Sequence, residues 1–191
     1  MKRLFCLLAG LLVTAAHGSR LFADGVPTYS LVVENDKFAG TDQYYTSGQS
    51  IASMREDVQK APWWAKRLVE RFSLCRDVGA SESCFRVDKG WRLALLIYTP
   101  EDITQTALLV NDHPYGGWLH ATSIVELRNR TTSHRFELGL GLVGDHSLAD
   151  DAQITLHRLI DAPKPRGWRN QLEDEPTLQL YYRFRRTVFE A

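Results

Sequence analysis

The sequence predicts an all-β protein: an antiparallel outer-membrane β-barrel with about six strands and a short helix in one loop. Two observations lead to this prediction. Apolar and polar residues alternate along several segments, which is the period of a β-strand with two different faces. Most of these segments are about nine to eleven residues long, which suits a tilted strand that crosses a bilayer. In chain order they are residues 28–35, 46–55, 90–99, 116–128, 135–143 and 177–186.

The alternation is clearest in the last two segments. One face of each carries the apolar residues, which are Phe136, Leu138, Leu140 and Leu142, then Leu178, Leu180, Tyr182 and Phe184. The opposite faces carry Arg135, Glu137, Gln179, Arg183 and Arg185. In an outer-membrane barrel the apolar face meets lipid and the polar face meets a wet interior. A soluble sandwich or a lipocalin-like barrel alternates in the opposite sense, and periodicity alone leaves both readings open.

Residues 1–23 predict a signal peptide, with cleavage between positions 16 and 23. Lys2 and Arg3 precede an apolar run over 5–16, and small residues follow that run. The run is short for a membrane-spanning helix, which needs about 20 apolar residues. The prediction is therefore an exported β-barrel domain over 24–191. The formal net charge of zero gives no indication of a nucleic-acid partner.

Two further segments have a helical pattern. Residues 57–74 carry tryptophans and arginines, and they fit either an amphipathic helix at a membrane surface or an ordinary packed connection. Residues 148–161 have Asp150 or Asp151 as the predicted N-cap. In this second helix Gln153 and His157 are four residues apart, which places them on one face.

Two cysteines remain once the predicted signal peptide is removed. They are Cys75 and Cys84, and in an exported protein such a pair predicts a disulfide. Two free thiols are the alternative. No histidine lies near them in the sequence, which argues against a zinc site.

Five motifs occur in a defined order along the chain. They are ENDKFAGTDQYYTSG (34–48), YTPEDI (98–103), NDHPYGGWL (111–119), GLGLVGDHSLADDAQITLHRLI (139–160) and GWRNQLEDEP (167–176). Together they resemble the N-terminal half of the outer-membrane lipid A 3′-O-deacylases, the LpxR family. The resemblance covers nearly the whole predicted mature chain. It implies an outer-membrane location, a lipopolysaccharide substrate and Ca²⁺-dependent hydrolysis of the 3′ ester-linked acyl group of lipid A.

The resemblance also implies site residues by position. The catalytic base is His157, and the residues implied to act with it are Gln153, Asn35, Asp36 and Thr46, of which Asn35, Asp36 and Thr46 are the implied Ca²⁺ ligands. Two family roles lack a clear counterpart. A family acidic residue falls near Pro163, so its role is either missing or moved to Asp161. A family lysine has no match between Glu101 and Asp112.

The residues themselves fit this chemistry. The chain has no Gly-x-Ser-x-Gly motif that would supply a serine nucleophile. A histidine can instead activate water, and a cation can stabilise the oxyanion as a Lewis acid. Amide, carboxylate and hydroxyl oxygens suit Ca²⁺ better than zinc. Strands that alternate in direction bring residues 35, 46, 98, 116, 143 and 173 to one side, which is predicted to be the outer side of the membrane.

Six strands do not close a lipid-spanning barrel, because the smallest such barrels have about eight. The sequence is therefore predicted to be part of a larger barrel, with completion by oligomerisation as the alternative. Two other functions fit the same pattern. One is an outer-membrane barrel that has lost its activity, and the other is a soluble periplasmic β-domain that binds lipid.

Overall fold

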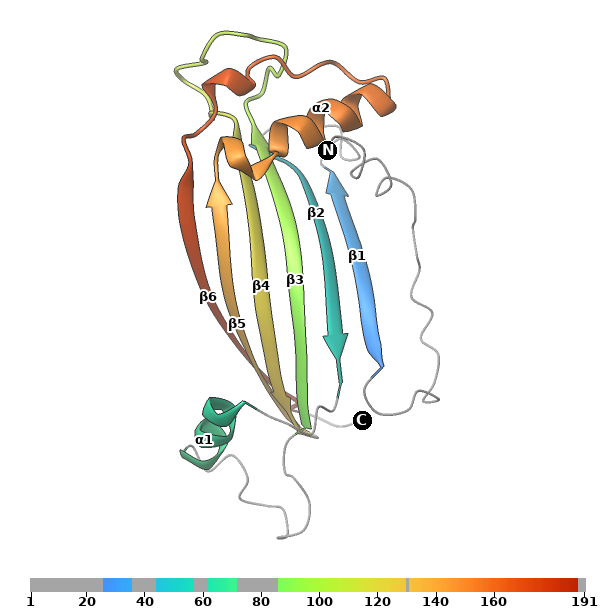
Figure 1. The fold of residues 1–191 in the computed structure, drawn as a ribbon, viewed down its shortest axis with the longest axis vertical. Coiled ribbons are helices and arrows are strands. Elements are labelled where there is room, and N and C mark those ends of the chain that lie inside the picture. The colour runs from blue at the N-terminus through green and yellow to red at the C-terminus, as the bar shows by residue number, and fades with distance from the viewer. Residues whose placement is uncertain (1–25, 36–43, 57–61, 72–85, 130, 189–191) are drawn as a thin grey trace.

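The computed structural model describes residues 26–35, 44–56, 62–71, 86–129 and 131–188. Within these ranges the chain forms one antiparallel six-stranded sheet with an α-helix at each end (Figure 1). The predicted signal peptide, Asp36 and the predicted Cys75–Cys84 disulfide lie outside the described residues.

The strands follow one another across the sheet in chain order, and each pairs with the next. They are β1 (Pro27–Asn35), β2 (Tyr44–Arg55), β3 (Arg86–Thr99), β4 (Gly116–Arg128), β5 (Thr132–Val143) and β6 (Glu175–Arg186). All six predicted strands are confirmed. The third begins earlier than its apolar pattern indicated, because Val87 and Asp88 pair with Leu127 and Glu126 of β4.

One face of the sheet is apolar and exposed. The register pairs Leu138 with Leu180 and Leu140 with Leu178, and each of these four side chains is more than half exposed. Leu93 lies on the same face of β3 and is also exposed. Monomeric soluble proteins rarely expose a continuous apolar surface of this kind. The predicted division of β5 and β6 into an apolar and a polar face is confirmed.

The opposite face carries charges that neutralise one another. Glu137 accepts hydrogen bonds from Arg92, at 2.7 Å, and from Arg135, at 2.6 Å. Arg135 also lies 3.4 Å from Glu126 of β4. The side chain of Glu137 is only 8% exposed. A carboxylate so far removed from water requires cationic partners, and this network supplies them from the strands on either side of β4.

Helix α1 (Trp63–Arg71) packs on the apolar face at one end of the sheet. Ala65 is fully buried against Val87, Val125 and Leu127. The ring of Trp64 meets Phe136 edge-on, with the ring centroids 5.6 Å apart. The segment is therefore helical over Trp63–Arg71, and this helix packs on the sheet.

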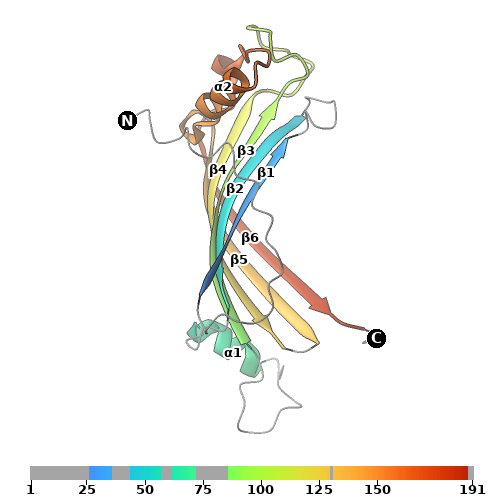
Figure 2. The same ribbon diagram turned by 90° about the vertical axis from the view of Figure 1, so that its right-hand side faces the viewer.

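Helix α2 (Ala149–Leu159) lies at the other end of the sheet and on the same side as α1, as Figure 2 shows. The prediction that Asp150 or Asp151 caps this helix is wrong. The N-cap is Leu148, in the left-handed conformation, and its side chain makes no capping hydrogen bond. Both aspartates lie in the first turn, where negative charge is favourable next to the helix dipole. Among the described residues, no helix is long and apolar enough to span a membrane.

Candidate active site

The site lies beneath α2, at the end of the sheet where β1, β3 and β5 terminate (Figure 1). A 3-10 turn, η2 (Asp145–Ser147), connects β5 to the helix. Gly117 of β4 allows this connection to approach closely, because a Cβ there would lie about 2 Å from Ser147 Oγ (2.1 Å) and Ala149 Cβ (2.2 Å). The sheet thus holds the first turn of α2 directly against β4.

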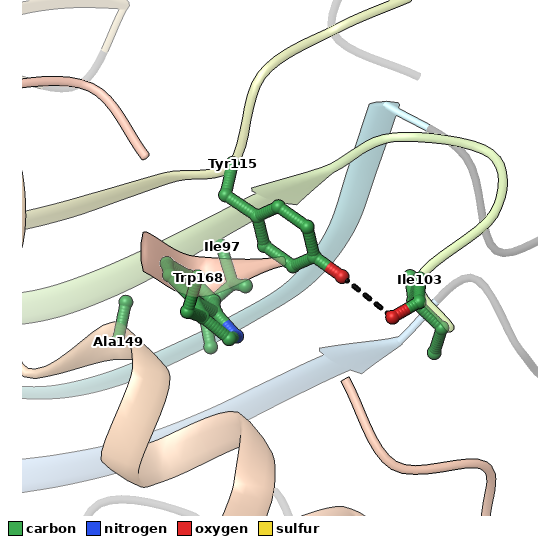
Figure 3. Close-up of a cluster of buried hydrophobic side chains, with 5 residues drawn as sticks. All are labelled: Ile97, Ile103, Tyr115, Ala149 and Trp168. Atoms are coloured by element: carbon green, nitrogen blue, oxygen red, sulfur yellow. Dashed lines mark hydrogen bonds between the residues drawn. The ribbon is translucent and has the colours of Figure 1, made fainter. Parts of the chain in front are cut away.

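A cluster of buried side chains supports the helix. Figure 3 shows its members, which are Ile97, Ile103, Tyr115, Ala149 and Trp168. The rings of Tyr115 and Trp168 lie 4.8 Å apart, and the Tyr115 hydroxyl donates to the Ile103 carbonyl at 2.9 Å. Ile97 belongs to the face of β3 that also carries Leu93. The helix therefore packs on the apolar side of the sheet rather than on its charged side.

Gln153 and His157 are buried together under α2, with exposures of 1% and 2%. Both lie on the helix face that meets the sheet, as their spacing predicted. Polar side chains that are buried this completely need hydrogen-bond partners. Each of the two finds its partner in the segment that follows the helix, and these two contacts define the site.

His157 is oriented by a backbone carbonyl. Its Nδ1 lies 2.7 Å from the carbonyl oxygen of Pro163. A carbonyl only accepts hydrogen bonds, so Nδ1 carries a proton. In the neutral tautomer that this contact selects, the lone pair of the ring lies on Nε2. The group that contacts Nδ1 at this position, where the resemblance implied an acidic residue, is the main-chain carbonyl of Pro163. Asp161, the expected substitute for that acidic residue, is an exposed residue with φ of 53° in the turn after the helix.

Gln153 is oriented by a tryptophan. Trp168 lies in a second 3-10 turn, η3 (Trp168–Asn170), and its indole nitrogen donates to Gln153 Oε1 at 2.8 Å. Gln153 Nε2 is buried, and no described residue accepts a hydrogen bond from it. Sequence reasoning placed Trp168 in a motif, GWRNQLEDEP, but assigned it no function.

Thr46 is buried at the same end of the sheet. A β-bulge between Tyr45 and Ser47 takes Thr46 out of the regular register with β3. Its hydroxyl lies 2.5 Å from that of Thr99, the last residue of β3, and both side chains are fully enclosed. Thr99 was not predicted as a site residue, because its partner lies 53 positions away in the chain.

The remaining predicted residues are placed only by the backbone. Asn35 is the last residue of β1 and pairs with Ser47, the neighbour of Thr46. The side chain of Asn35 and the whole of Asp36 lie outside the described residues. In the described part of the chain, no three His, Cys, Asp or Glu side chains gather to form a metal-binding cluster.

An ion pair joins η2 to Asp174, which directly precedes β6. His146 of η2 donates its backbone N–H to Asp174 at 3.0 Å, and its ring nitrogen contacts the same carboxylate. The hydrogen bond to Asp174, reinforced by its charge, raises the pKa of His146. The backbone N–H of His146 in turn lowers the pKa of Asp174. The pair ties the start of α2 to the segment leading into β6.

A family model described as "Outer membrane protein LpxR" matches residues 4–191. The chain belongs to the LpxR family. No match was found among curated proteins. Among solved structures, the LpxR protein of Salmonella typhimurium has a similar fold, with a TM-score of 0.53 and 16% sequence identity. The match covers 76% of this chain and 41% of that one, so the present chain spans less than half of the Salmonella protein.

Proteins of the LpxR family are outer-membrane proteins, so the two faces of the sheet are expected to contact different surroundings. We expect the face with Leu180 to contact lipid and the face with Gln179 to contact water. Arg183 and Arg185 share the face of Gln179, and an arginine on a lipid-facing barrel position at mid-bilayer costs about 2–4 kcal/mol. Leu180→Cys should therefore react with a lipid-soluble maleimide, and Gln179→Cys with a water-soluble one.

The unsubstituted chain in outer-membrane vesicles measures background labelling. Rapid modification of Leu180→Cys by the water-soluble reagent would contradict the assignment and favour a soluble β-domain.

Proposed function

We propose that this chain carries the ester-hydrolysing site of a lipid A 3′-O-deacylase. LpxR family membership supports the reaction class. The observation that carries the proposal is the burial of His157 and Gln153 together beneath α2, at the same end of the sheet as Thr46. A buried side-chain donor that no described residue uses, as at Gln153 Nε2, requires an explanation, and a catalytic role is one of the usual ones.

His157 is the proposed general base. Its Nδ1 is held by the Pro163 carbonyl, which leaves Nε2 to take a proton from a water molecule. The oxygen of that water then bonds to the carbonyl carbon of the ester, and the carbonyl π electrons move to the oxygen. When this tetrahedral intermediate collapses, the bond to the sugar oxygen breaks and His157 returns the proton to that oxygen. The products are a fatty acid and a free sugar hydroxyl.

Gln153 is the proposed hydrogen-bond donor to the developing oxyanion. Its Nε2 is buried, and no described residue uses either of its hydrogens. A donor that is already fixed and desolvated stabilises transition-state charge without further reorganisation. The helix places this donor one turn from His157, so the two groups can act on the same ester.

The oxygen-rich end of β1 and β2 fits a Ca²⁺ ion. The hydroxyls of Thr46 and Thr99 are neutral oxygen donors, and the register brings Asn35 next to Ser47. With Asp36, these residues provide the hard oxygen ligands that Ca²⁺ prefers. Asn35, Asp36 and Thr46 are the proposed ligands. When bound, the ion would supply Lewis-acid stabilisation of negative charge on the ester oxygen.

The placement of α2 suits a membrane-embedded substrate. The helix packs on the apolar face of the sheet, the face that also exposes Leu138 and Leu140. An acyl chain lying along that face would bring its ester to the rim of the sheet, next to His157.

Mass spectrometry of lipid A tests the proposal. The full-length chain is produced in a bacterium whose lipid A carries a 3′ acyloxyacyl group, and lipid A is compared with that of the empty-vector strain. We expect loss of the 3′ ester-linked acyl group. Unchanged lipid A, from cells in which the protein is folded in the outer membrane, would contradict the proposal and favour an inactive barrel.

A further inference from the structure

We infer that Trp168 is a positioning residue, which acts by fixing the side-chain amide of Gln153 in the orientation that leaves Nε2 free for the substrate. The inference rests on the proposed function, because the free Nε2 donor of Gln153 is needed only for the ester hydrolysis proposed above. In the proposed site, Trp168 contacts neither the reacting ester nor the metal.

The orientation follows from the chemistry of the two groups. An indole N–H is a donor only, so the atom of Gln153 that faces it at 2.8 Å is the amide oxygen. The other end of the amide, Nε2, is then necessarily turned away from Trp168. Without the indole donor, the amide can rotate by 180° about its last bond, and the oxygen can take the position of the nitrogen. A carbonyl oxygen in that position would repel the oxyanion that Nε2 is proposed to stabilise.

Burial and ring packing fix the position of the Trp168 side chain. It is 6% exposed, and its ring packs on Tyr115, whose hydroxyl is anchored on the Ile103 carbonyl. Gly167 permits this packing, because a Cβ there would lie 2.5 Å from the Tyr115 ring. Asn170 adds a hydrogen bond from its side chain to the Thr106 carbonyl at 3.0 Å.

One segment therefore orients both buried polar residues of α2. Pro163 accepts from His157, and Trp168 donates to Gln153, with only four residues between them in the chain. The connection between β3 and β4 braces this segment, since Leu172 N–H donates to the Tyr115 carbonyl at 2.9 Å. The arrangement assigns the segment after the helix to positioning, and it gives the motif that contains Trp168 a physical role.

Trp168→Phe tests the inference, because it keeps an aromatic ring in the cluster but removes the N–H. We expect kcat for lipid A deacylation to fall about 10- to 100-fold, the range typical of lost supporting hydrogen bonds at catalytic sites, with little change in KM. Trp118→Phe is the matched control. Its indole also donates one hydrogen bond, to Thr177 at 2.9 Å, but on the opposite face of the sheet, and its kcat should equal that of the wild type.

A double-mutant cycle separates positioning from simple stability. If Trp168 acts through Gln153, then Trp168→Phe should have no further effect on kcat in a Gln153→Ala protein. Two losses that multiply would overturn the inference. So would a Trp168→Phe protein with the kcat of the wild type.

A spectroscopic measurement keeps the inference testable even if the proposed function fails. The indole N–H resonance of Trp168, assigned by its absence in Trp168→Phe, should move upfield and exchange faster with water in Gln153→Ala. A wild-type protein that releases no acyl group refutes the proposed function alone. An indole resonance that is unchanged in Gln153→Ala refutes the hydrogen bond, whatever the protein hydrolyses.

Discussion

Replacement of His157 by alanine should lower the rate of lipid A deacylation by about 10²–10⁴-fold, the usual contribution of a general base. His157 is buried, and its Nδ1 is already committed to the Pro163 carbonyl, so the lone pair on Nε2 is the basic group that remains. The measurement is the release of fatty acid from lipid A by purified protein in detergent micelles. The amount of folded protein in the outer membrane is determined in parallel.

Two further variants make this result specific. His157→Asn retains an amide N–H that can donate to the Pro163 carbonyl but has no basic nitrogen, so it should be as inactive as His157→Ala. Arg158→Ala changes the next residue of the same helix, which is exposed, and should retain full activity. Wild-type activity in His157→Asn would show that the ring orients substrate and does not remove a proton.

Removal of Ca²⁺ should abolish deacylation, and its return should restore it. The oxygen donors at the ends of β1 and β2 are hard ligands, which select Ca²⁺ over softer metals. The hydrogen bond between Thr46 and Thr99 joins two neutral hydroxyls, so no charged side chain takes part in it. The experiment treats purified protein with a chelator and then adds Ca²⁺ or Mg²⁺ separately. Full activity in the presence of excess chelator would refute the calcium proposal and leave the oxyanion to protein donors such as Gln153.

Asp36→Ala should raise the Ca²⁺ concentration needed for half-maximal activity, or abolish activity, because it removes the one carboxylate among the proposed ligands. Asp151→Ala is a suitable control, since Asp151 is an exposed carboxylate in the first turn of α2. Its calcium requirement should match that of the wild type. An equal shift in both variants would point to a general effect of surface charge on lipopolysaccharide binding.

Features that depend on local pattern could be predicted from the sequence. Alternation gave the faces of β5 and β6, because successive side chains of a strand point to opposite sides whatever lies beyond them. Helical spacing placed Gln153 and His157 on one face for the same kind of reason. Strand direction then brought Asn35, Thr46 and the start of α2 to one end of the sheet. The motifs supplied the family, which the match over residues 4–191 confirms.

The partners of those residues depended on the tertiary structure. A backbone carbonyl can orient a histidine as well as a carboxylate can, but a carbonyl is present at every residue, so no sequence pattern singles out Pro163. The cap of α2 was predicted wrongly for a similar reason: aspartate favours an N-cap, yet packing of Ala149 against Gly117 fixes where the helix begins.

The sequence by itself therefore determined the strands, their two faces and the helix that carries His157, since each of these follows from a short repeating pattern. The tertiary structure alone decided what holds the site together. Thr46 meets Thr99 across 53 positions, and Gln153 meets Trp168 because the segment after the helix runs back along it. Such contacts depend on how distant segments pack, and hydrogen-bond geometry that is correct to a few tenths of an ångström exists only once the chain has folded.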